Sequence, residues 1–153
     1  MLFGRKKTPR VLDRANIVTG CPSEGHEDCI RRCGRMLLEA GYVEEGYIEG
    51  MLARDRSLST AIGNAIAIPH GEMEYKRHIL HTGLVVLTYP GGIDWGGETV
   101  KLVIGIAAKG DEHIGIMERI GEAFEEQSAV EEVVADADAG RLFGILSPDG
   151  EGG

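Results

Sequence analysis

A chain of 153 residues is long enough to form one domain with its own hydrophobic core. Its formal net charge of −9 is opposite in sign to the basic surface that binds nucleic acids or anionic membranes, so we expect neither as a partner. No apolar run reaches the roughly 20 residues of a membrane-spanning helix, and the first residues lead into no apolar leader, so we expect a cytoplasmic protein.

The first third of the chain predicts two helices. Residues 1–10 are basic with little apolar content, which predicts a flexible tail, and residues 11–17 predict a short strand. Apolar residues recur at helical spacing over 24–40, and Gly41 is typical of a helix stop. A second amphipathic helix is expected over 44–54, because glutamates in its first turn favour the helix dipole.

Three apolar runs in the middle of the chain predict buried strands. They cover 65–68, 82–89 and 100–107, and the longer two are continuous and rich in β-branched residues. Such runs are typical of strands that are covered on both faces. Between the last two runs, residues 90–97 are dense in glycine and predict a loop that continues neither strand.

The last third of the chain predicts three helices. An amphipathic pattern covers 114–124, shorter candidates cover 129–135 and 140–146, and residues 147–153 predict a second flexible tail. No internal repeat is present. We therefore expect a single α/β domain over 11–146, with a mixed central β-sheet flanked by helices on both faces.

The three cysteines, Cys21, Cys29 and Cys33, are an odd number in one short segment. A secreted disulfide framework usually has an even number spread along the chain, so we expect reduced thiols. A zinc site formed by His26, Cys29 and Cys33 is an alternative that helical spacing allows. We set it aside because buried cysteines commonly behave as small apolar residues, and no metal is expected.

His70 follows the predicted strand at 65–68 and lies between Pro69 and Gly71. These neighbours place its imidazole at a loop edge with backbone close by. A neutral imidazole is a competent nucleophile near pH 7, because its ordinary pKa is about 6.5, and a phosphorylated imidazole is labile enough for onward transfer. A structural role in the loop remains the alternative for His70 on these grounds alone.

Two further residues could help such a site. His113 falls at the predicted start of a helix, where backbone N–H groups and the helix dipole favour phosphate and where a second imidazole could donate a hydrogen bond. Arg54, at the end of the second predicted helix, could bind the same anion if the fold brings it near. Taken singly, capping or exposure also explains His113, and solvation also explains Arg54. Solvation is the expected state of His78 and His81.

Common cofactor motifs are missing from the sequence. It has no Walker A loop, no GxGxxG after a strand, no GxSxG and no HExxH. We therefore expect no nucleotide and no other cofactor.

Over residues 11–146 the chain resembles the mannitol/fructose-type enzyme IIA domain of the bacterial phosphoenolpyruvate-dependent sugar phosphotransferase system. Three stretches carry the resemblance in the family's order and spacing: residues 40–54, the Gly-Asn-Ala-Ile-Ala-Ile-Pro-His-Gly segment at 63–71, and residues 102–114. The mannitol branch is favoured by residues 82–83, by 89–90 with the glycines that follow, and by 104–108.

The resemblance implies an α/β fold with a mixed sheet and a phosphotransferase that works through a phosphohistidine. His70 would be the phosphoryl acceptor, His113 would assist it, and Arg54 matches the family arginine. The donor would be HPr, and the acceptor would be a cysteine of enzyme IIB. The chain contains no IIB or IIC segment, so we expect a free-standing subunit that meets the membrane only through enzyme IIC.

Two other functions stay open at this point. A regulatory, nitrogen-type enzyme IIA relative would share the fold, and its phosphorylation state would control partner proteins. A non-catalytic binding module would use His70 as a structural or ligand-contacting residue.

Overall fold

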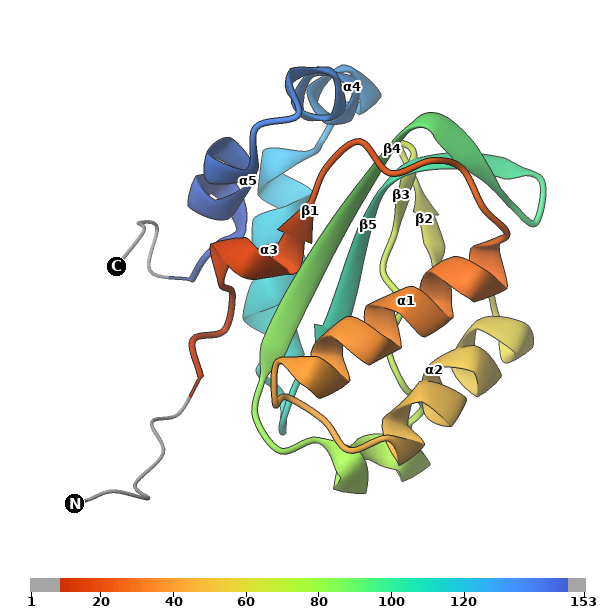
Figure 1. Ribbon diagram of the computed structural model, residues 1–153, viewed down its shortest axis with the longest axis vertical. Coiled ribbons are helices and arrows are strands. Elements are labelled where there is room, and N and C mark those ends of the chain that lie inside the picture. The colour runs from red at the N-terminus through yellow and green to blue at the C-terminus, as the bar shows by residue number, and fades with distance from the viewer. Residues whose placement is uncertain (1–8, 149–153) are drawn as a thin grey trace.

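Within residues 9–148, which the computed structural model describes, five strands form one mixed sheet (Figure 1). The two long strands, β4 and β5, are antiparallel neighbours at its centre. β1 pairs in parallel with β4, β3 pairs in parallel with β5, and β2 closes the other edge antiparallel to β3. The strands are β1 (Ile17–Val18), β2 (Ala61–Gly63), β3 (Ile66–Ala67), β4 (Gly83–Trp95) and β5 (Glu98–Ala107).

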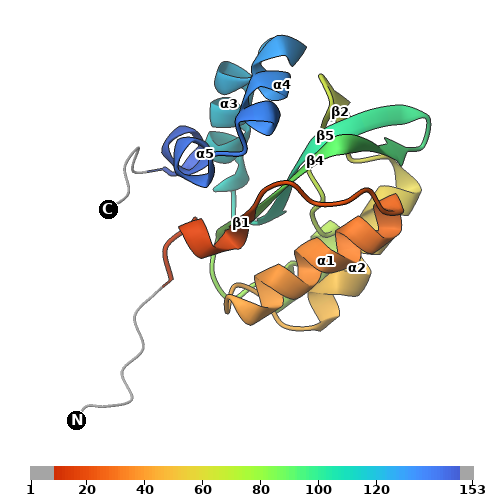
Figure 2. The same cartoon turned by 45° about the horizontal axis from the view of Figure 1, so that its top comes forward.

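Helices cover both faces of this sheet, and Figure 2 shows the two layers on either side of the strands. One layer is formed by α1 (His26–Glu39) and α2 (Gly46–Ser57), and the other by α3 (His113–Ala123), α4 (Gln127–Asp136) and α5 (Ala139–Leu146). Two 3₁₀ helices, η1 (Arg14–Asn16) and η2 (Met73–His78), lie in connections. The predicted α/β architecture is confirmed, with each predicted helix present within a few residues of its expected bounds.

Alternate residues of the central strands enter two separate cores. Leu84 and Val86 of β4 pack in the core under α3, α4 and α5, whereas Val85 and Leu87 pack in the core under α1 and α2. Successive side chains of a strand point to opposite faces, so a strand with helices on both sides must be apolar at every position. This explains the continuous apolar runs in the sequence.

The loop predicted at 90–97 is wrong, because β4 continues through most of it. Ile93 pairs with Val100, and the hairpin closes at Trp95 and Glu98. The register shifts between Thr88 and Ile93, and such an irregularity accommodates proline and glycine in a strand. The turn itself is the pair at 96–97, both glycines with positive φ.

The short strands also differ from the expectation. The strand predicted at 11–17 is reduced to two residues, because η1 precedes it and the side chain of Asp13 caps that helix by accepting from the N–H of Ala15 at 2.9 Å. The strand predicted at 65–68 covers only Ile66 and Ala67. β2 was not predicted, since its Ala-Ile-Gly sequence carries no strand pattern.

The two predicted tails lie largely outside the described residues. Of the C-terminal one, Ser147 is described: it is buried, and its N–H donates to the carbonyl of Phe143 at the end of α5. None of the helices in the described part of the chain has the length and apolar character needed to span a membrane.

Candidate functional site

A cavity of about 480 Å³ opens beside the end of β3 and the start of α3. His70, His113 and Arg54 all line it, although they come from three distant parts of the sequence. His70 follows β3, His113 is the first residue of α3, and Arg54 lies in the last turn of α2. The structure therefore brings together the three residues that the sequence predicted. Tyr47 and Lys76, which the sequence did not single out, line the same cavity.

His70 is held in register with the end of β5. It forms an isolated parallel bridge with Ile106, whose N–H donates to the carbonyl of Pro69 at 2.9 Å. The Nδ1 atom of His70 lies 2.7 Å from the carbonyl oxygen of Ile68. A carbonyl oxygen can only accept, so Nδ1 carries the proton and donates it. In the neutral ring this leaves the lone pair on Nε2.

The surroundings keep that ring neutral. Burial lowers the pKa of His70 below its ordinary value of 6.5, because the charged form loses solvation. The hydrogen bond to Ile68 acts in the opposite direction. Electrostatic interactions with Arg54, His113 and Lys76 lower the pKa further. At neutral pH, Nε2 of His70 is therefore an unprotonated nucleophile.

Tyr47 connects the residue after His70 to the central sheet. Its buried hydroxyl accepts from the N–H of Gly71 at 2.8 Å and donates to the carbonyl of Ile106 at 2.9 Å. Burial raises the pKa of Tyr47 to about 12, so the hydroxyl keeps the proton that it donates. A Cβ atom at position 71 would lie 2.5 Å from the Tyr47 ring, which explains the glycine. A buried tyrosine on an amphipathic helix looks like core in the sequence, and for this reason it was missed.

Arg54 is fixed by the backbone at the end of α2. Its Nη1 donates to the carbonyl of Leu58, and its own carbonyl accepts from the N–H of Leu58 and the hydroxyl of Ser57. A guanidinium has five N–H donors, so most remain for an anion in the cavity. Arg56, two residues later, is bound to Glu27 through two contacts of 2.9 Å and does not line the cavity.

A buried carboxylate that sequence reasoning missed lies next to Arg54. The Oδ1 atom of Asp55 accepts from the N–H and the hydroxyl of Thr60, at 2.9 and 2.6 Å, and from Nε1 of Trp95 at 3.0 Å. Its Oδ2 atom lies 3.4 Å from Nε2 of His26. This network ties the end of α2 to the β4–β5 hairpin. The sequence could have revealed this network only if the extension of the hairpin to Trp95 had been predicted.

The remaining candidates lie outside the cavity. Cys29 and Cys33 are buried, Cys21 is half-buried, and all three are free thiols. The neighbouring Cys29 and burial raise the pKa of Cys33, and burial raises that of Cys21, so neither is poised as a thiolate. His26 packs beside Trp95, and among the described residues no group of three or more His, Cys, Asp or Glu side chains could hold a metal ion.

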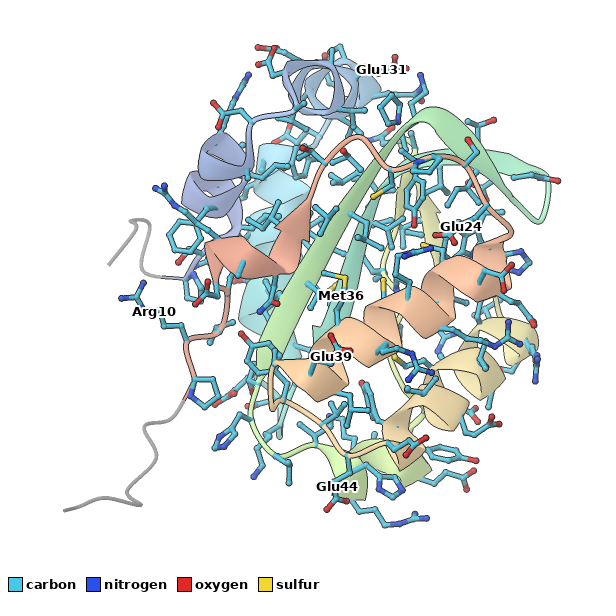
Figure 3. All side chains as sticks on the ribbon, in the orientation of Figure 1. Arg10, Glu24, Met36, Glu39, Glu44 and Glu131 are labelled. Atoms are coloured by element: carbon cyan, nitrogen blue, oxygen red, sulfur yellow. The ribbon has the colours of Figure 1, made fainter. Side chains whose placement is uncertain are left out.

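The expectation that His78 is simply solvated is wrong. Its Nδ1 atom lies 3.1 Å from Glu44, which Figure 3 labels beside η2. A Cβ atom at Gly46 would lie 2.6 Å from the same ring, so the imidazole packs against the start of α2. His81 is partly exposed, and its N–H donates to the carbonyl of Tyr42 at 3.1 Å.

Comparison with known proteins gives a consistent result. The model of the family described as "Phosphoenolpyruvate-dependent sugar phosphotransferase system, EIIA 2" matches residues 10–148. The mannitol-specific phosphotransferase enzyme IIA component of Halalkalibacterium halodurans is 37% identical over 136 residues, which cover 89% of this chain and 94% of that protein. The mannitol-specific EIICBA component of Vibrio cholerae is 37% identical over 139 residues, but the match covers only 21% of that longer protein.

A solved structure is similar to most of the chain. In the complex of enzyme IIAMTL and phosphorylated enzyme IIBMTL from Escherichia coli, one chain is 35% identical to this one. The two superpose with a TM-score of 0.79, covering 86% of this chain and 93% of that chain.

Proposed function

Because the chain belongs to the enzyme IIA type 2 family of the phosphoenolpyruvate-dependent sugar phosphotransferase system, we propose that it is a phosphoryl carrier that works through His70. The observation that carries this proposal is the hydrogen bond from Nδ1 of His70 to the carbonyl of Ile68. It leaves Nε2 unprotonated in a cavity that is also lined by Arg54 and His113. Relatives named as mannitol-specific make mannitol the proposed substrate of the system.

In the first transfer, the lone pair on Nε2 of His70 attacks the phosphorus atom of a phosphohistidine on HPr. A new N–P bond forms, the donor N–P bond breaks, and its electron pair returns to the donor ring. Nδ1 of His70 keeps its proton throughout and donates it in the hydrogen bond to the carbonyl of Ile68. Nε2 has no proton to lose, so no general base is required. Arg54 and His113 bind the phosphoryl oxygens and balance their charge, which is the main requirement of phosphoryl transfer.

In the second transfer, a cysteine thiolate of enzyme IIB attacks the same phosphorus atom. The S–P bond forms, the Nε2–P bond breaks, and the electron pair returns to His70. The relative solved in complex with phosphorylated enzyme IIB supports this choice of acceptor. We propose that the carrier works in the cytoplasm and meets the membrane only through enzyme IIC, and the fused EIICBA relative of Vibrio cholerae supports the link to enzyme IIC.

The proposal is tested by incubating the chain with phosphoenolpyruvate, enzyme I and HPr, and by measuring acid-labile phosphate by mass spectrometry. The parent and His81→Ala should gain one phosphoryl group, whereas His70→Ala should gain none. His81 is a matched control because it does not line the cavity. An unmodified parent in the presence of demonstrably active HPr from its own source would favour the binding-module function instead.

A further inference from the structure

Among the described residues that line the cavity of His70, two side chains are permanent cations: Arg54 and Lys76. We propose that the ammonium group of Lys76 binds the phosphoryl group on His70 while it holds the loop that leads to His113. This inference rests on the proposed function. It assigns to Lys76 a direct part in the transfer, where the sequence indicates only a charged connection between β3 and β4.

The first support is that Lys76 lines the cavity of His70 while its ammonium group is bonded to the loop before His113. Lys76 lies in η2, six positions after His70, and its Nζ donates to the carbonyl of Gly110 at 2.8 Å. Gly110 has a positive φ of 58° and stands at the turn before α3, whose first residue is His113. A lysine has three N–H donors, so two remain after the bond to Gly110. The same group can therefore fix the loop of one histidine and contact an anion on the other.

The second support is the charge of the cavity. Its lining includes one carboxylate, Glu72, against the two full cations Arg54 and Lys76. A phosphoryl group brings a further charge of about −1.5 to −2 at neutral pH. Without Lys76, Arg54 would be the one permanent cation facing both negative groups. With it, the two cations outweigh Glu72 by one positive charge, which offsets part of the phosphoryl charge.

Lys109 provides a matched control on the same loop. Its Nζ lies 3.4 Å from the carbonyl of Leu80, so it also links the loop before α3 to the segment before β4. It does not line the cavity. A general effect of losing a loop-tethering lysine should therefore be seen in Lys109→Met as well, whereas a role at the phosphoryl group belongs to Lys76 alone.

The test compares the parent with Lys76→Met, Lys76→Arg and Lys109→Met, using two phosphoryl donors. Phospho-HPr must dock on the protein, whereas phosphoramidate is a small donor with the same kind of N–P bond. We expect Lys76→Met to slow phosphorylation of His70 by at least about tenfold with both donors, in line with the loss of one charge-stabilising donor. Lys76→Arg should recover most of the rate, and Lys109→Met should match the parent.

A second readout separates charge from folding. In the unphosphorylated proteins, the NMR titration midpoint of His70 should rise in Lys76→Met and stay near the parent value in Lys76→Arg and Lys109→Met, because only the first removes a positive charge facing the ring. A Lys76→Met protein that keeps the parent's rates and midpoint overturns the proposal, and so does one that is slow with phospho-HPr alone. A parent that takes a phosphoryl group from neither donor rejects the proposed function itself.

Discussion

The hydroxyl group of Tyr47 accepts a hydrogen bond of 2.8 Å from the N–H of Gly71, the residue directly after His70. The same hydroxyl donates to the carbonyl of Ile106, so it joins α2 to the end of β5 and to the segment that carries His70. Two backbone groups therefore depend on one side-chain oxygen, 24 residues from Gly71 in the sequence.

Tyr47→Phe should lower both stability and activity. The ring keeps its packing, but the N–H of Gly71 and the carbonyl of Ile106 lose their partner in a buried site, which costs about 1–3 kcal/mol. Urea unfolding measures this loss, and the initial rate of His70 phosphorylation should fall with it. Tyr42→Phe is the control, because the Tyr42 hydroxyl also donates to a backbone carbonyl, that of Arg10, away from the cavity. Equal rates for the two variants would contradict the positioning role of Tyr47.

Arg54→Gln should slow phosphorylation of His70 by about 100- to 1000-fold, the range found when one preorganised donor to a developing charge is removed. It should also raise the pKa of His70, because the positive charge of Arg54 helps to depress it. Arg56→Gln is the control, since Arg56 is bound to Glu27 and lies outside the cavity. Initial rates and an NMR titration check both expectations. A fast Arg54→Gln protein would remove the guanidinium from the mechanism.

The pH dependence should follow the depressed pKa of His70. Burial lowers this pKa below 6.5, so the reactive neutral ring persists below that pH, and the phosphorylation rate should fall only as the pH drops through the folded value. At a pH between the folded pKa of His70 and 6.5, His70 is protonated in the unfolded chain but not in the folded one. The contribution of His70 to stability is therefore complete above pH 6.5 and is lost as the pH falls toward the folded pKa. Rate profiles and an NMR titration should give the same midpoint. A midpoint above 6.5 would be inconsistent with the buried ring.

Asp55→Ala should destabilise the fold by about 2–4 kcal/mol, because it leaves the donors of Thr60 and Trp95 without their buried acceptor. The chain has a single tryptophan, so fluorescence reports the change at Trp95 directly. Asp94→Ala is the control: its carboxylate caps the exposed hairpin turn by accepting from Gly97, and its loss should cost less than about 1 kcal/mol. If both variants unfold at the same urea concentration, the network does not anchor α2.

The sequence predicted the helices and the central strands because burial sets their apolar patterns. Burial on both faces gives β4 and β5 continuous apolar runs, which are easily recognised. It failed at 90–95, where proline and glycine resemble a loop but occupy an irregular part of a strand. The failure had a consequence for the site. Because residues 90–97 were predicted as a loop, Trp95 was not placed in a strand. No partner could therefore be predicted for Asp55.

The site was predictable to the extent that it follows from motifs. His70, His113 and Arg54 could be named from their local sequence, but only the fold shows that they line one cavity. Tyr47 and Lys76 are linked to the site by hydrogen bonds to Gly71 and Gly110, which are distant in sequence, so no local pattern marks them. The partner of each side chain is a backbone group, and nearly every residue type has the same backbone N–H and carbonyl groups, so the sequence does not identify the partner.

The most direct test of the account is the position of the phosphoryl group on the imidazole. The chain, labelled with ¹⁵N and phosphorylated through HPr, can be studied by NMR correlation of the histidine ring nitrogens with ³¹P coupling. The hydrogen bond from Nδ1 of His70 to Ile68 predicts coupling to Nε2 of His70, with Nδ1 still protonated. Coupling to Nδ1 of His70, or to the ring of another histidine such as His113, would contradict it.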